Sequence, residues 1–355
     1  MNRKKNGMRM AGVLAALAVG SSGAWAQERA AAPGGKPSEL SKPVKVFILL
    51  GQSNMVGMGK VTGGEGSLEN AVKNKQKYLY LVDKDGNWAA RDDVRYVFVM
   101  AGGRGGPLKF NDWLGVKGGK IGVELGIGHF VGEALDEPVM LLKSCIGNRS
   151  LGWDLLPPGS KGYEFTDPKD GKTYVYAGYK ESPLRWEKGT QPVAIGWYAG
   201  KQYDDDVAKA KEVLADLGKY YPGATKYEVA GFFWWQGDKD RYDAAHAAHY
   251  EENLVHLIKQ LRQDFEAPNA KFVLATLGQT QKGAGGNDGK ILEAMLAVDG
   301  EAGKYPEFKG NVKTVYTNPL SLGGASNSHY NGNAETYMNV GEAMGQAMVE
   351  LLKNK

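Results

Sequence analysis

Five apolar runs of strand length recur along the chain, and amphipathic helical patterns separate them. The apolar runs cover residues 44–50, 138–146, 229–236, 271–277 and 312–317. Helical periodicity covers residues 124–135, 204–220, 244–265, 289–303 and 334–352. Strands that are apolar along their whole length and alternate with helices predict a parallel sheet covered on both faces. We therefore predict an α/β fold with about five parallel strands, formed by residues 43–355 as one domain.

Two long stretches interrupt this alternation and are predicted to be inserted loops. Residues 61–120 include a predicted hairpin over residues 78–99, with Asp-Gly-Asn at 85–87 as its turn signal, and a glycine-rich segment. Residues 152–202 include a second predicted hairpin around FTDPKDGKTYVY, together with many aromatic residues. Insertions of this length in an α/β domain usually carry function.

The first 26 residues are predicted to be a secretory signal peptide. Basic residues without an acidic one lie within positions 2–9, the apolar stretch MAGVLAALAVG follows, and AWA precedes Gln27. This order is typical of export signals, and the apolar part is short for a membrane span, although an uncleaved anchor is the alternative. Residues 27–42, rich in alanine, proline, glycine and charge, are predicted to be a flexible linker. The sequence thus predicts an exported protein, periplasmic or extracellular.

Cleavage of the signal peptide changes the charge balance. The full chain has 44 Lys and Arg residues against 40 Asp and Glu residues, and residues 1–26 hold four basic residues and no acidic one, which leaves 40 of each sign. This balance argues against nucleic acid or an anionic membrane as a partner, because both require a clustered positive field. Cys145 is the single cysteine, so the chain forms no internal disulfide, and we interpret it as a small buried residue.

Groups suited to acyl transfer follow several of the predicted strands. Ser53 follows the first strand, Gly147 the second and Gln236 the third, and His329 precedes the last predicted helix. Because the carboxyl ends of parallel strands meet at one edge of a sheet, these groups are expected to converge there. Each has an ordinary structural explanation by itself, such as a turn or a helix cap for Ser53. Together they match a nucleophile, an oxyanion hole and a general base.

Three motifs resemble the SGNH-hydrolase superfamily. They are GQSNM at 51–55, WWQGD at 234–238 and a late histidine before the final helix. More narrowly, they resemble the sialate O-acetylesterase and acetylxylan esterase branch of carbohydrate esterases, over most of residues 44–350. The resemblance implies a three-layer α/β/α flavodoxin-like fold and a serine carboxylic-ester hydrolase that requires no cofactor. It further implies a secreted enzyme that removes acetyl groups from an acetylated carbohydrate.

Carried over position by position, the resemblance assigns Ser53 as the nucleophile and His329 as the base. The backbone at Ser53, Gly147 and Asn148 and the side chain of Gln236 would hold the oxyanion. The histidines inside predicted helices are interpreted as packing or surface residues; they are His129, His246, His249 and His256.

The sequence departs from the family pattern at the group that should orient the base. The usual Asp-x-x-His has Ser326 in place of the acid, and the usual Trp-x-Gln-Gly-Glu ends here in Asp238. We hypothesise that Asp238 replaces the missing acid, with a Ser–His dyad supported by a backbone carbonyl as the alternative. Asn148 replaces a family glycine, and Glu124, which lies where the family has Gly-Pro-Glu, is interpreted as structural.

Residues that flank the predicted site are expected to contact the substrate; they are Gln52, Arg149, Trp153 and Trp235. The aromatic residues of 152–202 suit the faces of sugar rings, and a small core beneath the loop explains them equally well. The acidic and histidine-containing run at 238–249 has no recognised metal-ligand spacing, so no metal is predicted. The alternatives to a carbohydrate O-acetylesterase are a non-catalytic glycan-binding protein and an esterase for a non-sugar ester. The identity of the glycan and the oligomeric state stay open.

Overall fold

Seven strands form the central sheet of the computed structural model, which describes residues 34–35, 39–101 and 106–354. The strands are β1 (Val44–Gly51), β3 (Ala90–Val99), β4 (Leu108–Gly115), β6 (Val139–Ser144), β10 (Tyr227–Trp235), β11 (Lys271–Ala275) and β12 (Val312–Val315). Their order is β12-β11-β10-β1-β6-β3-β4, and every neighbouring pair is parallel except β3 and β4. The predicted signal peptide (1–26) and most of the predicted linker (27–42) lie outside the described residues.

The predicted α/β fold is confirmed. Strands β1, β6, β10, β11 and β12 coincide with the five predicted apolar runs. Strand β1 has β6 on one side and β10, β11 and β12 in succession on the other. Numbered by these five strands alone, this is the 2-1-3-4-5 order of flavodoxin-like folds, in which ligands bind where the order reverses. The reversal point here is β1, next to β10.

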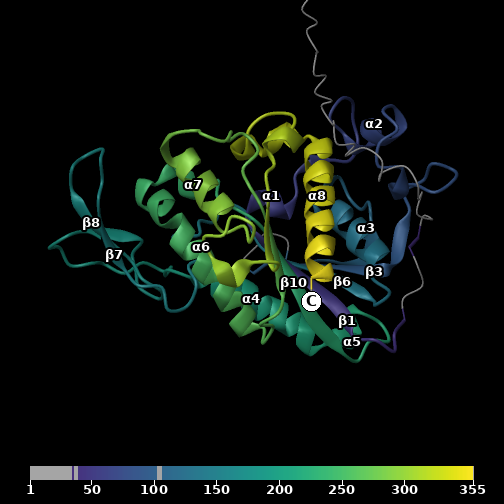
Figure 1. The fold of residues 1–355 in the computed structure, drawn as a ribbon, viewed down its shortest axis with the longest axis horizontal. Helices are drawn as coiled ribbons and strands as arrows, with labels where there is room; N and C mark the ends of the chain where they lie inside the picture. Colours follow the sequence, from purple (N-terminus) through teal and green to yellow (C-terminus); the bar gives the residue numbers. More distant parts are fainter. Residues whose placement is uncertain (1–33, 36–38, 102–105, 355) are drawn as a thin grey trace, which may run out of the picture. The chain divides into compact units, whose positions relative to one another are not determined.

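Helices cover both faces of the sheet. They are α1 (Ser53–Val56), α2 (Leu68–Lys73), α3 (Glu124–Ala134), α4 (Lys201–Ala215), α5 (Leu217–Tyr220), α6 (Ala244–Asp264), α7 (Gly286–Ala297) and α8 (Ala334–Lys353). Val46, Ile48 and Leu50 of β1 pack into one core with α4, α6 and α7, whereas Phe47 and Leu49 pack into a second core with α3 and α8. Figure 1 shows these two groups of helices on opposite sides of the strands. No helix among the described residues is long and apolar enough to cross a membrane.

The first predicted insertion contributes to the sheet. The predicted hairpin over 78–99 is wrong in its pairing, because β3 pairs in parallel with β6 and antiparallel with β4. The turn at 85–87 does form, but in the described residues a single antiparallel bridge, Val82 to Trp88, flanks it. The reason is burial: residues 94–99 of β3 are covered on both faces, which stabilises them as an interior strand. A short two-stranded sheet also forms here, from β2 (Gly59–Lys60) and β5 (Lys120–Ile121).

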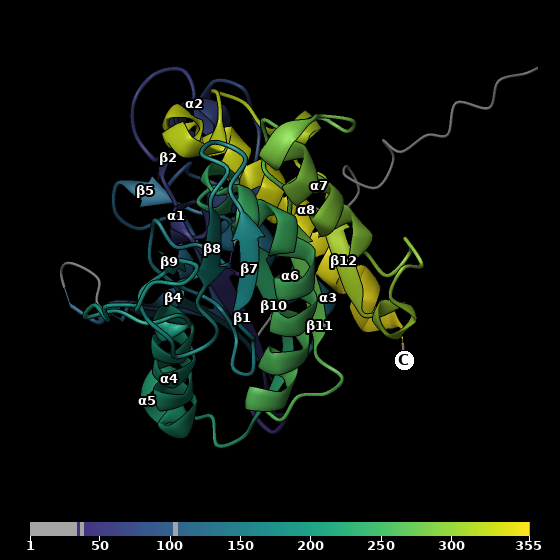
Figure 2. The same ribbon diagram turned by 90° about the vertical axis from the view of Figure 1, so that its left-hand side faces the viewer.

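The second insertion forms a small sheet of its own. Strands β7 (Tyr163–Thr166) and β8 (Thr173–Tyr176) form the predicted hairpin, and β9 (Arg185–Glu187) adds a third strand. The ring of Tyr163 stacks on His249 of α6 at 3.7 Å, and the Tyr176 hydroxyl contacts the Asp243 carboxylate at 3.2 Å. Figure 2 shows β7 and β8 beside α6. His249 therefore packs against the insertion, as its helical position predicts.

Candidate active site

The candidate residues gather at the carboxyl ends of β1, β6 and β10. Ser53 begins α1 directly after β1, and its side chain is buried apart from 8% of its surface. Gly51 makes this tight turn possible, because it has a φ of +147° and a side chain there would place its Cβ 2.3 Å from the Trp235 carbonyl oxygen. The backbone N–H of Gln52 donates to the same carbonyl at 3.2 Å. The turn therefore holds Ser53 at the point where the strand order reverses.

The loop after β6 lies against Ser53. Gly147, which follows β6, lies so close that a Cβ built on it would be 3.3 Å from the Cβ of Ser53. Asn148 comes next, in the left-handed region with φ 59°. In the described part of the chain, the N–H groups of Ser53, Gly147 and Asn148 donate no hydrogen bond to the protein. The fold thus places Gly147 beside Ser53, with Asn148 next in the chain.

The Gln236 side chain lies close by but is fully engaged. Its Oε1 accepts from the Tyr250 hydroxyl at 2.8 Å. Its Nε2 faces three acceptors: Oε1 of Gln52 at 3.1 Å, the Arg149 carbonyl oxygen at 2.9 Å and Oδ2 of Asp240 at 2.5 Å. An amide nitrogen has two hydrogens, so these acceptors already use them. The role predicted for Gln236 as an oxyanion donor therefore has no free N–H in this arrangement.

Asp240 holds the loop that carries the backbone donors, and the sequence reasoning missed it. Its buried carboxylate accepts from the backbone N–H groups of Leu151 and Gly152 at 2.9 and 2.8 Å, as well as from Gln236. Burial raises the pKa of this carboxyl group, and its hydrogen bonds oppose the rise. Asp243 instead caps α6 by accepting from the Ala245 N–H at 2.9 Å. The described residues contain no group of three or more His, Cys, Asp or Glu side chains that could hold a metal.

His329 lies on a strained turn within a 3-10 segment, Ser326–Gly332, that packs against α1. His329, Tyr330 and Asn331 have φ values of 52°, 53° and 53°, and the left-handed conformation costs a non-glycine residue about 1–2 kcal/mol. Tyr330 offsets this strain, because its fully buried ring stacks on Trp235 at 5.8 Å and its hydroxyl accepts from the Gly278 N–H at 3.1 Å. Strain of this kind is concentrated at functional sites.

The Asp238 carboxylate lies near His329 but does not bind its ring. Its Oδ1 accepts from the Ser326 hydroxyl at 2.6 Å and from Nε of Arg241 at 2.9 Å. Among the described residues, no ion pair within 4.0 Å joins Asp238 to His329. Ser326 occupies the position of the usual family acid. Here its hydroxyl instead donates to the carboxylate of Asp238, which follows β10.

The pKa of His329 is lowered, principally because the ring is partly buried. The charge of Asp238 opposes this effect by favouring the imidazolium, whereas the charge of Lys120 adds to it. A lowered pKa keeps the imidazole neutral at neutral pH, which is the form that accepts a proton. Within the described residues, the ring donates no hydrogen bond to the protein.

Comparison with known proteins gives the family. The family model described as "Carbohydrate esterase, sialic acid-specific acetylesterase" matches residues 43–154 and 181–350. The chain belongs to this family. The resemblance predicted from the sequence is confirmed at this level, and the unmatched residues 155–180 contain β7 and β8.

Solved structures agree with the fold of this carbohydrate esterase. A protein from Arabidopsis thaliana superposes with a TM-score of 0.50 at 20% sequence identity, over 88% of this chain and 99% of that chain. A carbohydrate acetylesterase from Xanthomonas citri gives a TM-score of 0.51 at 14% identity, over 88% of this chain and 57% of that chain. At these identities the likeness shows the fold alone. A search of curated proteins gave no match.

The residues predicted to contact substrate lie in different environments. Trp235 is fully buried, with its indole N–H donating to the Thr276 carbonyl at 3.0 Å, so it has no surface to offer. Trp153 is 8% exposed and belongs to a small core beneath the second insertion. Arg149 is accessible: its guanidinium lies 4.9 Å from the centre of the Trp197 ring and borders a cavity of about 470 Å³ beside the Gly147 loop. The small-core interpretation of the insertion's aromatic residues is thus confirmed for Trp153.

A buried ion pair between Lys143 and Glu124 contacts the end of α1. Nζ of Lys143, on β6, lies 2.6 Å from Oε2 of Glu124 and 3.3 Å from the carbonyl oxygen of Val56 at the end of α1. Oε1 of Glu124 accepts from the Gly122 N–H at 2.9 Å. This agrees with the structural role predicted for Glu124. Burial raises the pKa of the neighbouring Cys145 thiol, so this side chain stays protonated.

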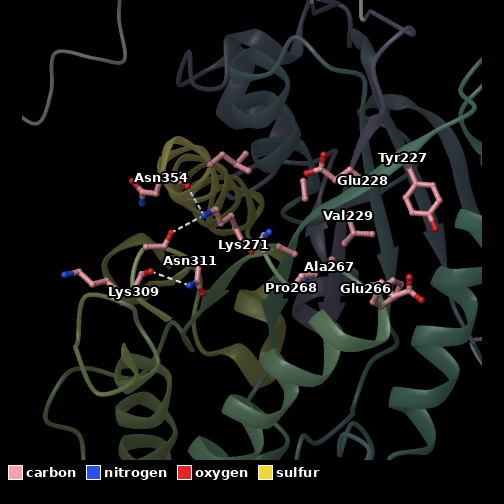
Figure 3. Close-up of a pocket in the computed structure, with 16 residues that line it drawn as sticks. Tyr227, Glu228, Val229, Glu266, Ala267, Pro268, Lys271, Lys309, Asn311 and Asn354 are labelled. Carbon is pink, nitrogen blue, oxygen red and sulfur yellow. Dashed lines mark hydrogen bonds between the residues drawn. The ribbon is translucent and has the colours of Figure 1, made fainter. Parts of the chain in front are cut away.

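A second cavity, of about 1070 Å³, lies at the opposite edge of the sheet, away from the candidate site. Residues before β11 and β12 and at the end of α8 line it (Figure 3). Nζ of Lys271 points into this region and donates to the carbonyl oxygens of Gly310 and Asn354 at 3.4 and 3.0 Å. These contacts join the start of β11 to the segment before β12 and to the end of α8. The candidate active site lies at the opposite, carboxyl ends of the strands.

Proposed function

We propose that this family member is an exported carbohydrate O-acetylesterase in which Ser53 is the nucleophile and His329 the general base. The observation that carries the mechanism is the close approach of Gly147 to Ser53, together with backbone N–H groups at Ser53, Gly147 and Asn148 that are unbonded within the described protein. The turn that carries His329 packs against the same short helix. Family membership supports the acetylesterase chemistry, and the N-terminal sequence pattern supports export.

The proposed reaction has two steps. The Ser53 hydroxyl oxygen attacks the acetyl carbonyl carbon while His329 takes the hydroxyl proton, and the backbone N–H groups stabilise the tetrahedral oxyanion. Collapse expels the sugar oxygen, which takes the proton from His329, and leaves acetyl-Ser53. A water molecule then gives its proton to His329 and attacks the acetyl carbon. Release of acetate returns the proton to Ser53.

Two measurements on the purified protein test this function. The first is acetate release from an aryl acetate and from O-acetylated glycans. The second is mass-spectrometric mapping of a fluorophosphonate adduct, which is expected on Ser53 because the reagent traps an activated serine. An inert protein that still binds acetylated glycans would instead support the non-catalytic alternative. Cleavage of the aryl ester with no activity on any glycan would support an esterase for a non-sugar ester.

We expect the pH dependence of kcat/KM to report the environment of His329. Because the pKa of this ring is lowered and the base must be neutral, the acid limb should lie below the usual value of about 6.5. Asp238→Asn removes the charge that raises this pKa, so the limb should move to lower pH and the plateau should fall, because a weaker base accepts the proton less readily. Lys120→Met should move the limb to higher pH, because it removes a charge that lowers the pKa.

A double variant that exchanges the positions of the aspartate and the serine serves as the control. In Asp238→Ser combined with Ser326→Asp, the carboxylate returns to the position three residues before His329 that the family uses. Since the two side chains are 2.6 Å apart, the swap should recover activity lost on replacing Asp238 alone. Unchanged pH limb and plateau in Asp238→Asn would show that this carboxylate does not support the base.

A further inference from the structure

Gln52, the residue before the proposed nucleophile, has a buried side-chain amide. Among the described residues its oxygen accepts hydrogen bonds and its nitrogen donates none. The side chain is 2% exposed, and its Oε1 accepts from Nε2 of Gln236 at 3.1 Å and from the backbone N–H of Lys239 at 3.2 Å. A backbone N–H can only donate, so the atom that faces Lys239 must be the amide oxygen. The contact therefore fixes which end of the amide carries the hydrogens.

The nitrogen of this amide has no hydrogen-bond partner among the described residues. Within the described residues, Nε2 of Gln52 donates no hydrogen bond, and it is not among the buried polar atoms that are sealed from solvent without a partner. The small accessible part of Gln52 thus includes a donor. An accessible N–H whose direction is fixed by the contacts of the amide oxygen is suited to donate to a ligand atom.

Gln236 is held in the opposite way. Tyr250 fixes its Oε1, and the carboxylate of Asp240 and two other oxygens occupy its Nε2. Its hydrogens stabilise the loop after β6 and the amide oxygen of Gln52. Gln236 therefore acts on the site through Gln52 and through the loop after β6.

We propose that Gln52 is a catalytic residue whose Nε2–H stabilises the tetrahedral oxyanion beside the backbone donors, and that Gln236 is a positioning residue. The inference rests on the serine mechanism proposed above. The side-chain donor of the oxyanion hole is then Gln52, directly before Ser53, and not Gln236, which follows β10.

The test compares an oxygen ester with the matching thionoester in wild type and variants. Gln52→Glu keeps an oxygen for the Lys239 N–H and removes the amide hydrogens, and Gln52→Met removes both without charge. Loss of one oxyanion donor typically lowers kcat by about 10²–10³-fold, and we expect that loss with little change in KM. Sulfur accepts hydrogen bonds weakly, so the preference for the oxygen ester over the thionoester should fall with the same substitutions.

The matched control is Gln236→Met, which removes a positioning residue. It should lower kcat, and the part of its effect that passes through Gln52 should be absent in a protein that already carries Gln52→Met. Thermal unfolding of each variant separates a folding defect from a catalytic one. Gln52→Met with wild-type kcat and wild-type ester preference would overturn the inference and leave the serine esterase intact. A wild-type protein without esterase activity would overturn both proposals.

Discussion

Replacement of Ser53 by alanine is expected to lower kcat for acetyl-ester hydrolysis by at least about 10⁴-fold, with the fold preserved. The hydroxyl oxygen forms the acyl-enzyme, and without it only the smaller acceleration from the backbone donors and substrate binding remains. The side chain is small and 8% exposed, so its loss leaves almost no cavity. Acetate release under saturating substrate measures kcat, and circular dichroism checks the fold.

The companion variants make this result specific. His329→Ala should reduce kcat by a comparable factor, and the double variant should be no worse than either single one, because the two groups act as a unit. Ser41→Ala alters a serine whose hydroxyl contacts Glu39, away from the site, and should keep wild-type activity. Substantial activity in Ser53→Ala would exclude the serine mechanism.

Lys143→Met is expected to destabilise the protein by about 3–5 kcal/mol. The Lys143 side chain is completely buried, and its removal leaves the buried Glu124 carboxylate without its counter-charge. The rings of Tyr96 and Phe98, 5.4 and 5.2 Å from Nζ, cannot replace it. The Val56 carbonyl at the end of α1 also loses a donor, so the turn that holds Ser53 loosens. Urea unfolding measures the change in free energy.

A surface pair of the same type provides the control. Lys73 lies 2.6 Å from Glu69 one helical turn away, and its side chain is 59% exposed. Lys73→Met should change stability by less than about 1 kcal/mol, since water already solvates both charges. Adding Glu124→Gln to Lys143→Met should recover part of the lost stability, because the uncompensated charge is gone. Equal effects of the two lysine substitutions would contradict a special role for the buried pair.

The sequence predicted the strands and helices well where burial on both sides gave a clear pattern. Strands β1 and β10 are almost uninterrupted apolar runs, and the apolar positions of α6 and α8 repeat with the helical period, so their bounds came out within about two residues. Strand β3 was assigned to a hairpin because a turn signal precedes it. Its parallel partner β6 is about 40 residues away in sequence, a distance that no local pattern reports.

The sequence identified the candidate site residues by their position after strands. It did not indicate which contacts their side chains make. Ser53 and Gly147 lie in adjacent turns because their strands are neighbours. Trp235 looked available for substrate as part of a motif, but the pleat turns it into the core against Tyr330. Asp240 looked like part of an acidic run, and only the fold shows that it binds the backbone of the loop at 151–152.

By itself, the sequence determined the α/β class, the family and the residues at the strand ends, because burial periodicity and short motifs are local properties. Only the tertiary structure decided which hydrogen-bonding groups are already occupied. Gln236 and Gln52 are chemically identical, and neither residue type nor position along a strand indicates which amide keeps a free N–H. Their difference arises because the fold places donors, Tyr250 and Lys239, at the oxygen of each amide, and an acceptor, the Asp240 carboxylate, at the nitrogen of Gln236.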